Sequence, residues 1–227
     1  MGWDPWKPYQ YLDNNKKLVG LDIKLIGSTI EHMGCEIKYV KIPWKRLLLS
    51  VKDGSIDFAA GVSKTNERSA WGYFSHTYRK SDIGLFILKE DKHKYPYDSL
   101  TTLFKNIRFS VGMLRGAYIG EEVKMLLNNP KTRESFELVS IETQNPKKLL
   151  VNRIDGFLAD KVTGRQYLRE LEGLYMAVIH PMHVFSSDLH LLFSKQSTSQ
   201  KLVDKFNKSL SVLQKNGAHQ KIFNEYK

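Results

Sequence analysis

The chain has 227 residues, a formal net charge of +11 and a sequence isoelectric point near 9.5. Hydrophobic residues make up 41% and charged residues 26%, a composition typical of a globular protein with one large domain or two small ones. No apolar run approaches the roughly 18 residues of a membrane-spanning helix. The single Cys35 excludes an internal disulfide framework and a four-cysteine metal site, and we expect it to be a packed small residue.

The positive charge does not by itself predict a nucleic-acid partner. The lysines and arginines are spread along the chain, and no block of five like charges exists. We therefore expect a solvated, lysine-rich surface and no nucleic acid as partner. The opening "MGWDPW" has no charged and apolar leader, and "MGW" resembles the end of a first strand. We expect an exported protein whose signal segment has been removed.

The first part of the chain predicts alternating helices and strands. Apolar residues at helical spacing predict a helix after Asp22, which is its expected cap, and Gly34 is its expected stop. The segment "CEIKYV" (35–40) alternates like a strand, and a second helix is predicted from Trp44 to Val51. The short apolar segment "IDFAA" (56–60) predicts a buried strand of a parallel sheet.

A second block with the same alternation follows the hydrophilic segment "KEDKHKYPYDS" (89–99). Strands are predicted at 107–114, 136–141 and 154–159, with helices after "RGAY" (115–118) and at 146–151. The C-terminal region predicts a helix that is interrupted at Gly217, with one apolar stripe formed by Leu202, Phe206, Leu210 and Leu213.

The two blocks resemble each other. "LLSVKDGSIDFAAG" (48–61) and "LLVNRIDGFLAD" (149–160) both run from an apolar helix through a turn to Ile-Asp and an apolar strand. This favours two similar α/β lobes, and ligands of open α/β sheets bind beyond the carboxyl ends of the strands. Arg68 follows one such end and Asp160 lies at the other.

These residue types match the ends of a free amino acid. Arg68, with the hydroxyl of Ser63 and the backbone of Gly61, is suited to a carboxylate, because a guanidinium binds a carboxylate in a bidentate fork. The Asp160 carboxylate is suited to an ammonium group. The alternative is that each charged residue forms a structural salt bridge within its own lobe.

The order of the motifs resembles the family 3 extracellular solute-binding proteins, the amino-acid receptors of ABC importers. The resemblance covers nearly the whole chain. It runs through "WKPYQYLDNNKKLVGLDIKLI", "GSIDFAAGVSKTNER", "FSHTY", "NRIDGFLAD" and "LHLLFSK" with the terminal helices. It implies a two-lobe, type II periplasmic-binding-protein-like α/β fold, with a central cleft between mixed-sheet lobes that are joined by two hinge crossings. Lobe 1 would comprise residues 1–87 and 184–227, and lobe 2 residues 88–183.

The resemblance also implies roles for individual residues. Arg68 would bind the α-carboxylate of the ligand with Ser63 and Gly61, and Asp160 would bind its α-amino group. Trp6 lies where the family places an aromatic ring over the ligand, and Trp44 lies in a segment that lines the side-chain pocket. The implied protein is a monomeric, periplasmic binding protein with an inner-membrane ABC permease as partner and no cofactor, metal or catalytic residue.

One turn departs from the family pattern. The family commonly has Gly-Ser/Thr-Thr in the second lobe, where this chain has Gly116-Ala117-Tyr118. The backbone amides remain available for a carboxylate, while Tyr118 replaces the short hydroxyl by a more distant one or by an aromatic wall. The identity of the ligand therefore stays open.

Two other functions remain as alternatives. Cyclohexadienyl dehydratases share the fold and need an acid in the cleft, but no further carboxylate follows Asp160 until Glu170. A ligand-sensing domain of a receptor is the other alternative. The aromatic residues near the expected cleft mouth predict a long or flat side chain on the ligand, with Asp4 as a possible partner for a cationic one. Trp3 is the tryptophan expected only to pack the lobe.

Overall fold

The computed structural model describes residues 1–226, so that Lys227, the last residue of the predicted lobe 1, lies outside the described residues. The chain forms two compact units, unit 1 with Met1–Lys80 and Ser187–Lys227, and unit 2 with Ser81–Ser186. These boundaries differ from the expected ones after residues 87 and 183. Each boundary lies inside a long continuous strand, where no glycine, proline or change of composition marks it in the sequence.

Unit 1 contains short strands, three longer helices and the ends of two long strands. Its elements are β1 (Gly2–Trp3), β2 (Tyr11–Leu12), β3 (Leu18–Val19), α1 (Leu21–His32), β4 (Val40–Lys41), α2 (Trp44–Asp53), β5 (Phe58–Ser63), α3 (Asn66–Trp71), β6 (Gly72–Phe74), α9 (Gln200–Lys215) and α10 (Ala218–Asn224). The strands β7 (Arg79–Leu88) and β12 (Phe185–Ser194) carry the chain from one unit to the other.

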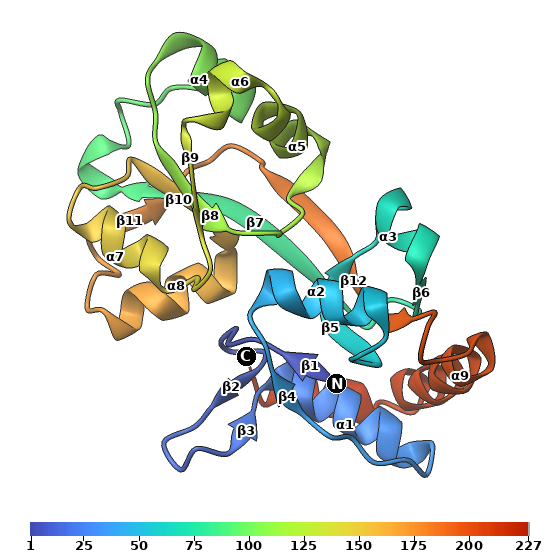
Figure 1. Cartoon of the computed structure of the whole chain (residues 1–227). Coiled ribbons are helices and arrows are strands. Elements are labelled where there is room, and N and C mark those ends of the chain that lie inside the picture. The colour runs from blue at the N-terminus through green and yellow to red at the C-terminus, as the bar shows by residue number, and fades with distance from the viewer. Residues whose placement is uncertain (227) are drawn as a thin grey trace. The chain divides into compact units, whose positions relative to one another are not determined.

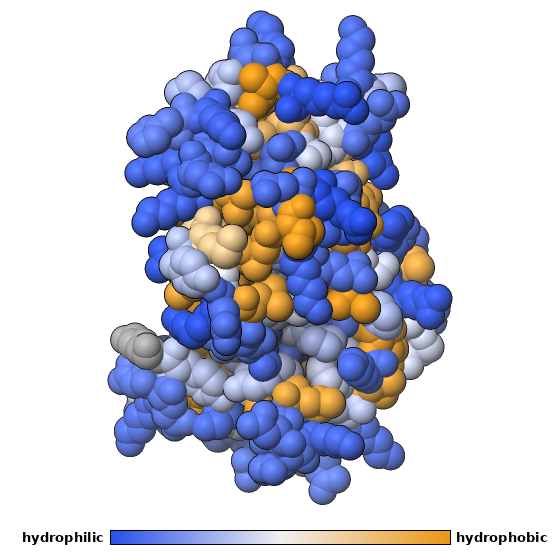
Figure 2. Space-filling model, turned by 90° about the vertical axis from the view of Figure 1, so that its left-hand side faces the viewer, coloured by the Kyte–Doolittle hydropathy of each residue, from blue (hydrophilic) through white to orange (hydrophobic). Residues whose placement is uncertain are grey.

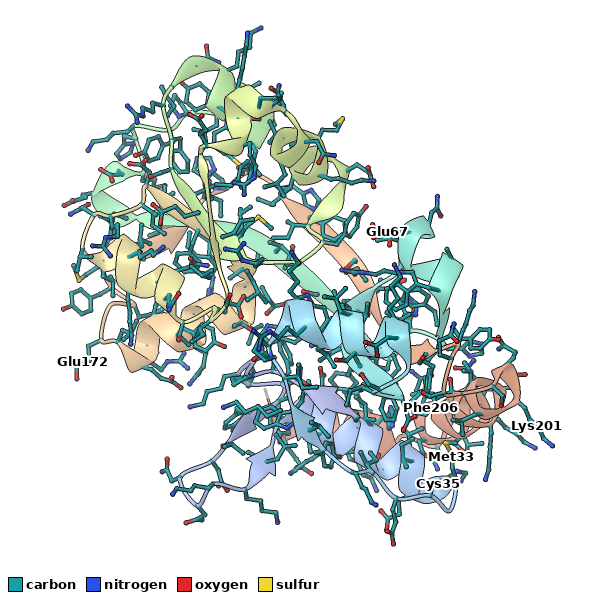
Figure 3. All side chains as sticks on the ribbon, viewed as in Figure 1. Met33, Cys35, Glu67, Glu172, Lys201 and Phe206 are labelled. Atoms are coloured by element: carbon teal, nitrogen blue, oxygen red, sulfur yellow. The ribbon has the colours of Figure 1, made fainter. Side chains whose placement is uncertain are left out.

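The sheet of unit 1 is mixed, as the resemblance implies. Strand β1 pairs in parallel with β4 and β5, while β12 pairs antiparallel with β5 and β6. Helix α9 packs against α1, and both lie on the same side of the unit in Figure 1. Phe206 points from α9 into the unit, where it is fully buried, whereas Lys201 on the same helix points into solvent (Figure 3). This is the apolar stripe that the sequence predicts.

Unit 2 also contains a mixed sheet with helices between its strands. Its elements after β7 are a short 3-10 helix (Lys89–Asp91), α4 (Leu100–Asn106), β8 (Val111–Leu114), α5 (Gly120–Asn128), α6 (Pro130–Arg133), β9 (Phe136–Val139), α7 (Gln144–Leu150), β10 (Gly156–Asp160), α8 (Lys161–Glu170) and β11 (Ala177–Ile179). Strand β8 pairs in parallel with β9 and β10, and β7 pairs antiparallel with β10 and β11. Phe86 and Phe157 stack in the core, with ring centroids 4.7 Å apart.

Three local predictions are wrong. Asp22 is not the cap of the first helix, which begins at Leu21 after Gly20, but a buried residue of its first turn. The segment 35–40 contributes only Val40 to a strand, because β1 pairs with this edge only at Val40 and Lys41, and Ile37 packs against the core from an irregular stretch of chain. Cys35, expected to be packed, is exposed beyond the end of α1, near the buried Met33 (Figure 3).

The surface agrees with the charged composition. Hydrophilic residues cover most of the face shown in Figure 2, with smaller apolar patches among them. No helix within residues 1–226 combines the length and the apolar character that crossing a membrane requires.

Gly61 is a point of close approach in strand β5. Its φ is +72°, which side-chain-bearing residues rarely adopt, and a Cβ atom there would lie 2.5 Å from Cζ3 of Trp6. Gly34 has a nearly equal φ of +69°, but a Cβ atom there would meet no atom within 4 Å. A comparison of substitutions at the two glycines therefore distinguishes the cost of the left-handed backbone from the cost of overlap with Trp6.

We expect Gly61→Ala to destabilise the protein more than Gly34→Ala. Both variants carry the left-handed backbone cost of about 1–2 kcal/mol, and Gly61→Ala adds about 1–3 kcal/mol for overpacking against the indole ring. Urea denaturation followed by circular dichroism measures both free energies of unfolding. Equal losses in the two variants would show that the Trp6 ring moves aside without cost.

Candidate functional site

Arg68 is held at the carboxyl end of strand β5. Thr65 caps helix α3, and its hydroxyl accepts a hydrogen bond of 3.2 Å from the backbone N–H of Arg68. The guanidinium Nη1 of Arg68 donates to the carbonyl oxygen of Ser63 at 2.9 Å, and the residue is buried. Glu67, its neighbour in sequence, points into solvent (Figure 3). The short helix thus turns one charged side chain inward and leaves the other in water.

Ser63 links β5 to the returning strand β12. Its hydroxyl lies 3.0 Å from the hydroxyl of Ser187, and its backbone pairs with Leu189. Ser187 was not predicted as a site residue, because its partner is 124 positions away in the sequence. The structure therefore brings two hydroxyl groups together at Ser63, the residue whose carbonyl oxygen accepts from Arg68.

The aromatic residues predicted for the site lie on two elements of unit 1. Trp6 is half-buried and packs against Gly61 and the ring of Tyr9. Trp44 begins helix α2, where its backbone N–H donates to the carboxylate of Asp4 at 2.9 Å. Burial raises the pKa of Asp4, although the hydrogen bond from Trp44 opposes the rise. Trp3 is buried in the core, as expected.

A buried charged cluster behind Trp6 was not predicted. Asp22 accepts from Nε and Nη2 of Arg79 at 2.6 and 3.0 Å and from the hydroxyl of Tyr78 at 2.7 Å. The guanidinium carbon of Arg79 lies 3.6 Å from the ring centroid of Tyr9 and 4.5 Å from that of Trp6. The partners are 57 positions apart in the sequence, so no local pattern could have revealed the pair.

Burial and the opposed charges act together on this cluster. Burial by itself lowers the pKa of Arg79, but the Asp22 carboxylate and the nearby tyrosines reverse the effect and raise it. Burial, with the negative charge of Asp22 adding to it, raises the pKa of Tyr78 well above its usual value. The guanidinium is therefore charged and the phenol is protonated at physiological pH.

In unit 2, Asp160 ends strand β10 and caps helix α8. Its Oδ1 accepts from the backbone N–H groups of Val162 and Thr163 at 3.0 and 3.2 Å. Its Oδ2 accepts from the hydroxyl of Ser81, on strand β7, at 2.7 Å. The residue is buried. The carboxylate is therefore fixed in orientation by a helix start and by a neighbouring strand, and Ser81 is another residue that the sequence analysis did not predict.

The Gly116–Tyr118 turn also belongs to unit 2. Gly116 is exposed with a φ of +84°, between strand β8 and helix α5. The hydroxyl of Tyr118 donates to Glu121 at 2.9 Å, and its ring meets Phe185 edge-on at 5.5 Å. The tyrosine hydroxyl thus binds a residue at the start of helix α5, while its ring packs against Phe185.

The structure groups the predicted residues by unit. It brings Trp6 to Gly61 and Arg68 to Ser63 in unit 1, and it places Gly116, Tyr118 and Asp160 in unit 2. Within residues 1–226, no group of three or more His, Cys, Asp or Glu side chains is arranged to hold a metal ion. The functional groups available are therefore a guanidinium, a carboxylate, hydroxyls and aromatic rings, which suit binding through charge and stacking.

The chain and its fold are similar to several known proteins. An arginine-binding periplasmic protein of Mannheimia haemolytica is 25% identical over 228 residues, covering 97% of this chain and 87% of the relative. The fold matches a histidine kinase sensor domain with a TM-score of 0.85 (19% identity, 99% of this chain and 92% of the other). It also matches an ancestral arginine-binding protein bound to arginine with a TM-score of 0.82 (21% identity, 99% and 95%).

A family model matches residues 1–227. The family consists of solute-binding proteins and not of enzymes, so the dehydratase alternative is set aside. The chain belongs to the bacterial extracellular solute-binding proteins, family 3.

Proposed function

We propose that this protein binds one free amino acid by its α-carboxylate and α-ammonium groups and delivers it to an ABC permease of the inner membrane. The observation that carries the proposal is the buried guanidinium of Arg68 at the end of β5, beside the Ser63 carbonyl oxygen. A buried guanidinium has lost most of its hydration, so a ligand carboxylate gains a strong, charge-assisted pair of hydrogen bonds there.

The Asp160 carboxylate is the proposed partner of the α-ammonium group. The amides at the start of α8 and the Ser81 hydroxyl hold it in one orientation. Binding to a group that is already oriented costs less conformational entropy than binding to a mobile one. Because Arg68 and Asp160 belong to different units, we propose that the units close on the ligand by a hinge motion at the two crossing strands.

The first candidate for the ligand is arginine. The relative from Mannheimia haemolytica and the ancestral protein are both described as arginine-binding. In this chain, Trp6 and Trp44 offer aromatic surface to the aliphatic stem or the guanidinium of such a ligand, and Asp4 offers a carboxylate. Another ancestral structure of the same fold, which is described as bound to glutamine, makes glutamine the second compound to test.

A ligand-sensing domain is the second candidate function. The specific observation is the close match to the histidine kinase sensor domain, which covers 99% of this chain. Both functions use the same binding chemistry. The complete reading frame and its neighbouring genes distinguish them, because a receptor joins the domain to a signalling module and an importer is encoded with a permease.

Arg68→Ala should abolish detectable binding of arginine while leaving the protein folded. Removing one member of a desolvated, hydrogen-bonded charge pair costs about 2–5 kcal/mol of affinity. Isothermal titration calorimetry gives the affinity, and urea denaturation gives the free energy of unfolding of the same sample. The matched control is Arg46→Ala, at an exposed position of α2. If Arg68→Ala lowers stability and retains affinity, the residue forms only a structural salt bridge.

Asp160→Asn should weaken binding and leave the start of α8 intact. Asparagine keeps an oxygen that can cap the helix but loses the charge that attracts an ammonium group. Asp160→Ala removes both and should cost about 1 kcal/mol of stability in addition. Calorimetry and urea denaturation on the two variants separate the roles. An Asn variant that binds like the unaltered protein would restrict Asp160 to helix capping.

Competition among glycine, alanine, glutamate, glutamine, phenylalanine and arginine should favour the long or flat side chains. Aromatic walls gain area and cation–π attraction from them, with cation–π contacts contributing about 0.5–2 kcal/mol. A thermal-shift series followed by calorimetric displacement ranks the compounds. Glycine or alanine binding as tightly as phenylalanine or arginine would show that Trp6 and Trp44 do not shape the pocket.

A further inference from the structure

The ring of Trp6 is held from several directions within unit 1. Gly61 leaves room for it, since a side chain there would overlap Cζ3. The ring of Tyr9 meets it edge-on, with centroids 4.7 Å apart and planes inclined by 60°. The guanidinium of Arg79 lies 4.5 Å from its centroid, close enough for cation–π attraction. Of these supports, only the guanidinium carries a charge.

The position of that guanidinium is fixed by Asp22. Two nitrogens of Arg79 donate to its two carboxylate oxygens, and the Tyr78 hydroxyl donates to one of the same oxygens. The side chains of Arg79 and Asp22 are 3% and 0% exposed, so water does not loosen the pair. A planar guanidinium can make this bidentate contact while its face meets an aromatic ring, whereas a lysine ammonium cannot do both.

Stability alone is a weak reason for such a pair. Desolvating two charges costs free energy that their attraction often only repays, and apolar replacements of buried pairs are often neutral or stabilising. The pair does, however, hold a flat, rigid group against Trp6. Arg79 is also next to the Lys80–Ser81 boundary, where strand β7 leaves unit 1.

We propose that the Asp22–Arg79 ion pair is a positioning element for Trp6 and thereby sets the affinity of the ligand site. The inference rests on the proposed function in one respect, namely that Trp6 contacts the bound amino acid. Arg79 acts through the indole ring and does not touch the ligand. Its removal changes the orientation of the ring before any ligand is present, and it weakens binding only as long as Trp6 is there.

Two measurements test this, and the first needs no ligand. The protein is labelled with 5-fluorotryptophan, and Trp6→Phe identifies the fluorine resonance of Trp6. We expect Arg79→Lys to shift or broaden that resonance and to leave those of the other three tryptophans in place. Arg46→Lys, the same exchange at an exposed site of α2, should change none of them. An unmoved Trp6 resonance in Arg79→Lys overturns the proposal.

The second measurement is a double-mutant cycle on the dissociation constant of arginine. Arg79→Lys should weaken binding at least about fivefold in the unaltered protein and less than about twofold in a Trp6→Ala background. An equal loss in both backgrounds overturns the proposal, because Arg79 would then act independently of Trp6. If Arg79→Lys does not fold, the double variant Asp22→Asn/Arg79→Met takes its place, since it leaves no unpaired buried charge.

The two proposals fail in different ways. If the folded, unaltered protein binds none of the amino acids tested, the proposed function is wrong, and the fluorine spectrum still decides whether Arg79 positions the ring. If arginine binds and neither the spectrum nor the cycle responds to Arg79→Lys, the positioning role is wrong and the proposed function stands.

Discussion

A charge removed from water must be met by an opposite charge or by several hydrogen bonds, and this constraint organises both units of the protein. The Asp22 carboxylate is fully buried and is satisfied by Arg79 and Tyr78. Asp160 is satisfied by helix amides and by Ser81. In each case the partners come from different elements, so that satisfying the charge also ties a helix to a strand.

The same constraint distinguishes two kinds of buried charge. The Asp22–Arg79 pair is neutralised inside unit 1, and its geometry is bidentate on the carboxylate. Arg68 donates to the backbone carbonyl oxygen of Ser63, and this hydrogen bond helps to orient its guanidinium at the end of β5. The neutralised pair can support neighbouring groups, whereas the Arg68 guanidinium is oriented by the backbone at the end of a strand.

Close packing around strand β5 is a second constraint on unit 1. Strand β5 ends at Ser63 and passes Gly61, where a left-handed backbone lets the indole of Trp6 approach. Strand β5 thus carries Ser63 and the close contact with the Trp6 ring, and it leads to Arg68. At position 61 this arrangement requires glycine. A site that binds a small polar solute needs such fixed groups, because each side chain ordered on binding costs affinity.

The sequence by itself determined several of the helices, the core strands β5, β8, β9 and β10, and the polar residues that follow or end two of these strands. Periodicity predicted α2 and α9, the apolar segments predicted β5 and β10, and the order of motifs indicated the family. These signals are local, or lie in a fixed order along the chain. Arg68 and Asp160 could be selected because each directly follows or ends a buried strand.

Only the tertiary structure decided which side chains meet. Asp22 seemed a helix cap from its neighbours, but it is the partner of Arg79, and Ser187 reaches Ser63 from a strand 124 positions away. The alternation in 35–40 predicted a strand, yet most of that segment has no neighbouring strand to pair with. The physical reason is common to these cases. Backbone preference depends on residues a few positions away, whereas the partner of a buried charge or of a strand edge is whichever segment the folded chain brings there.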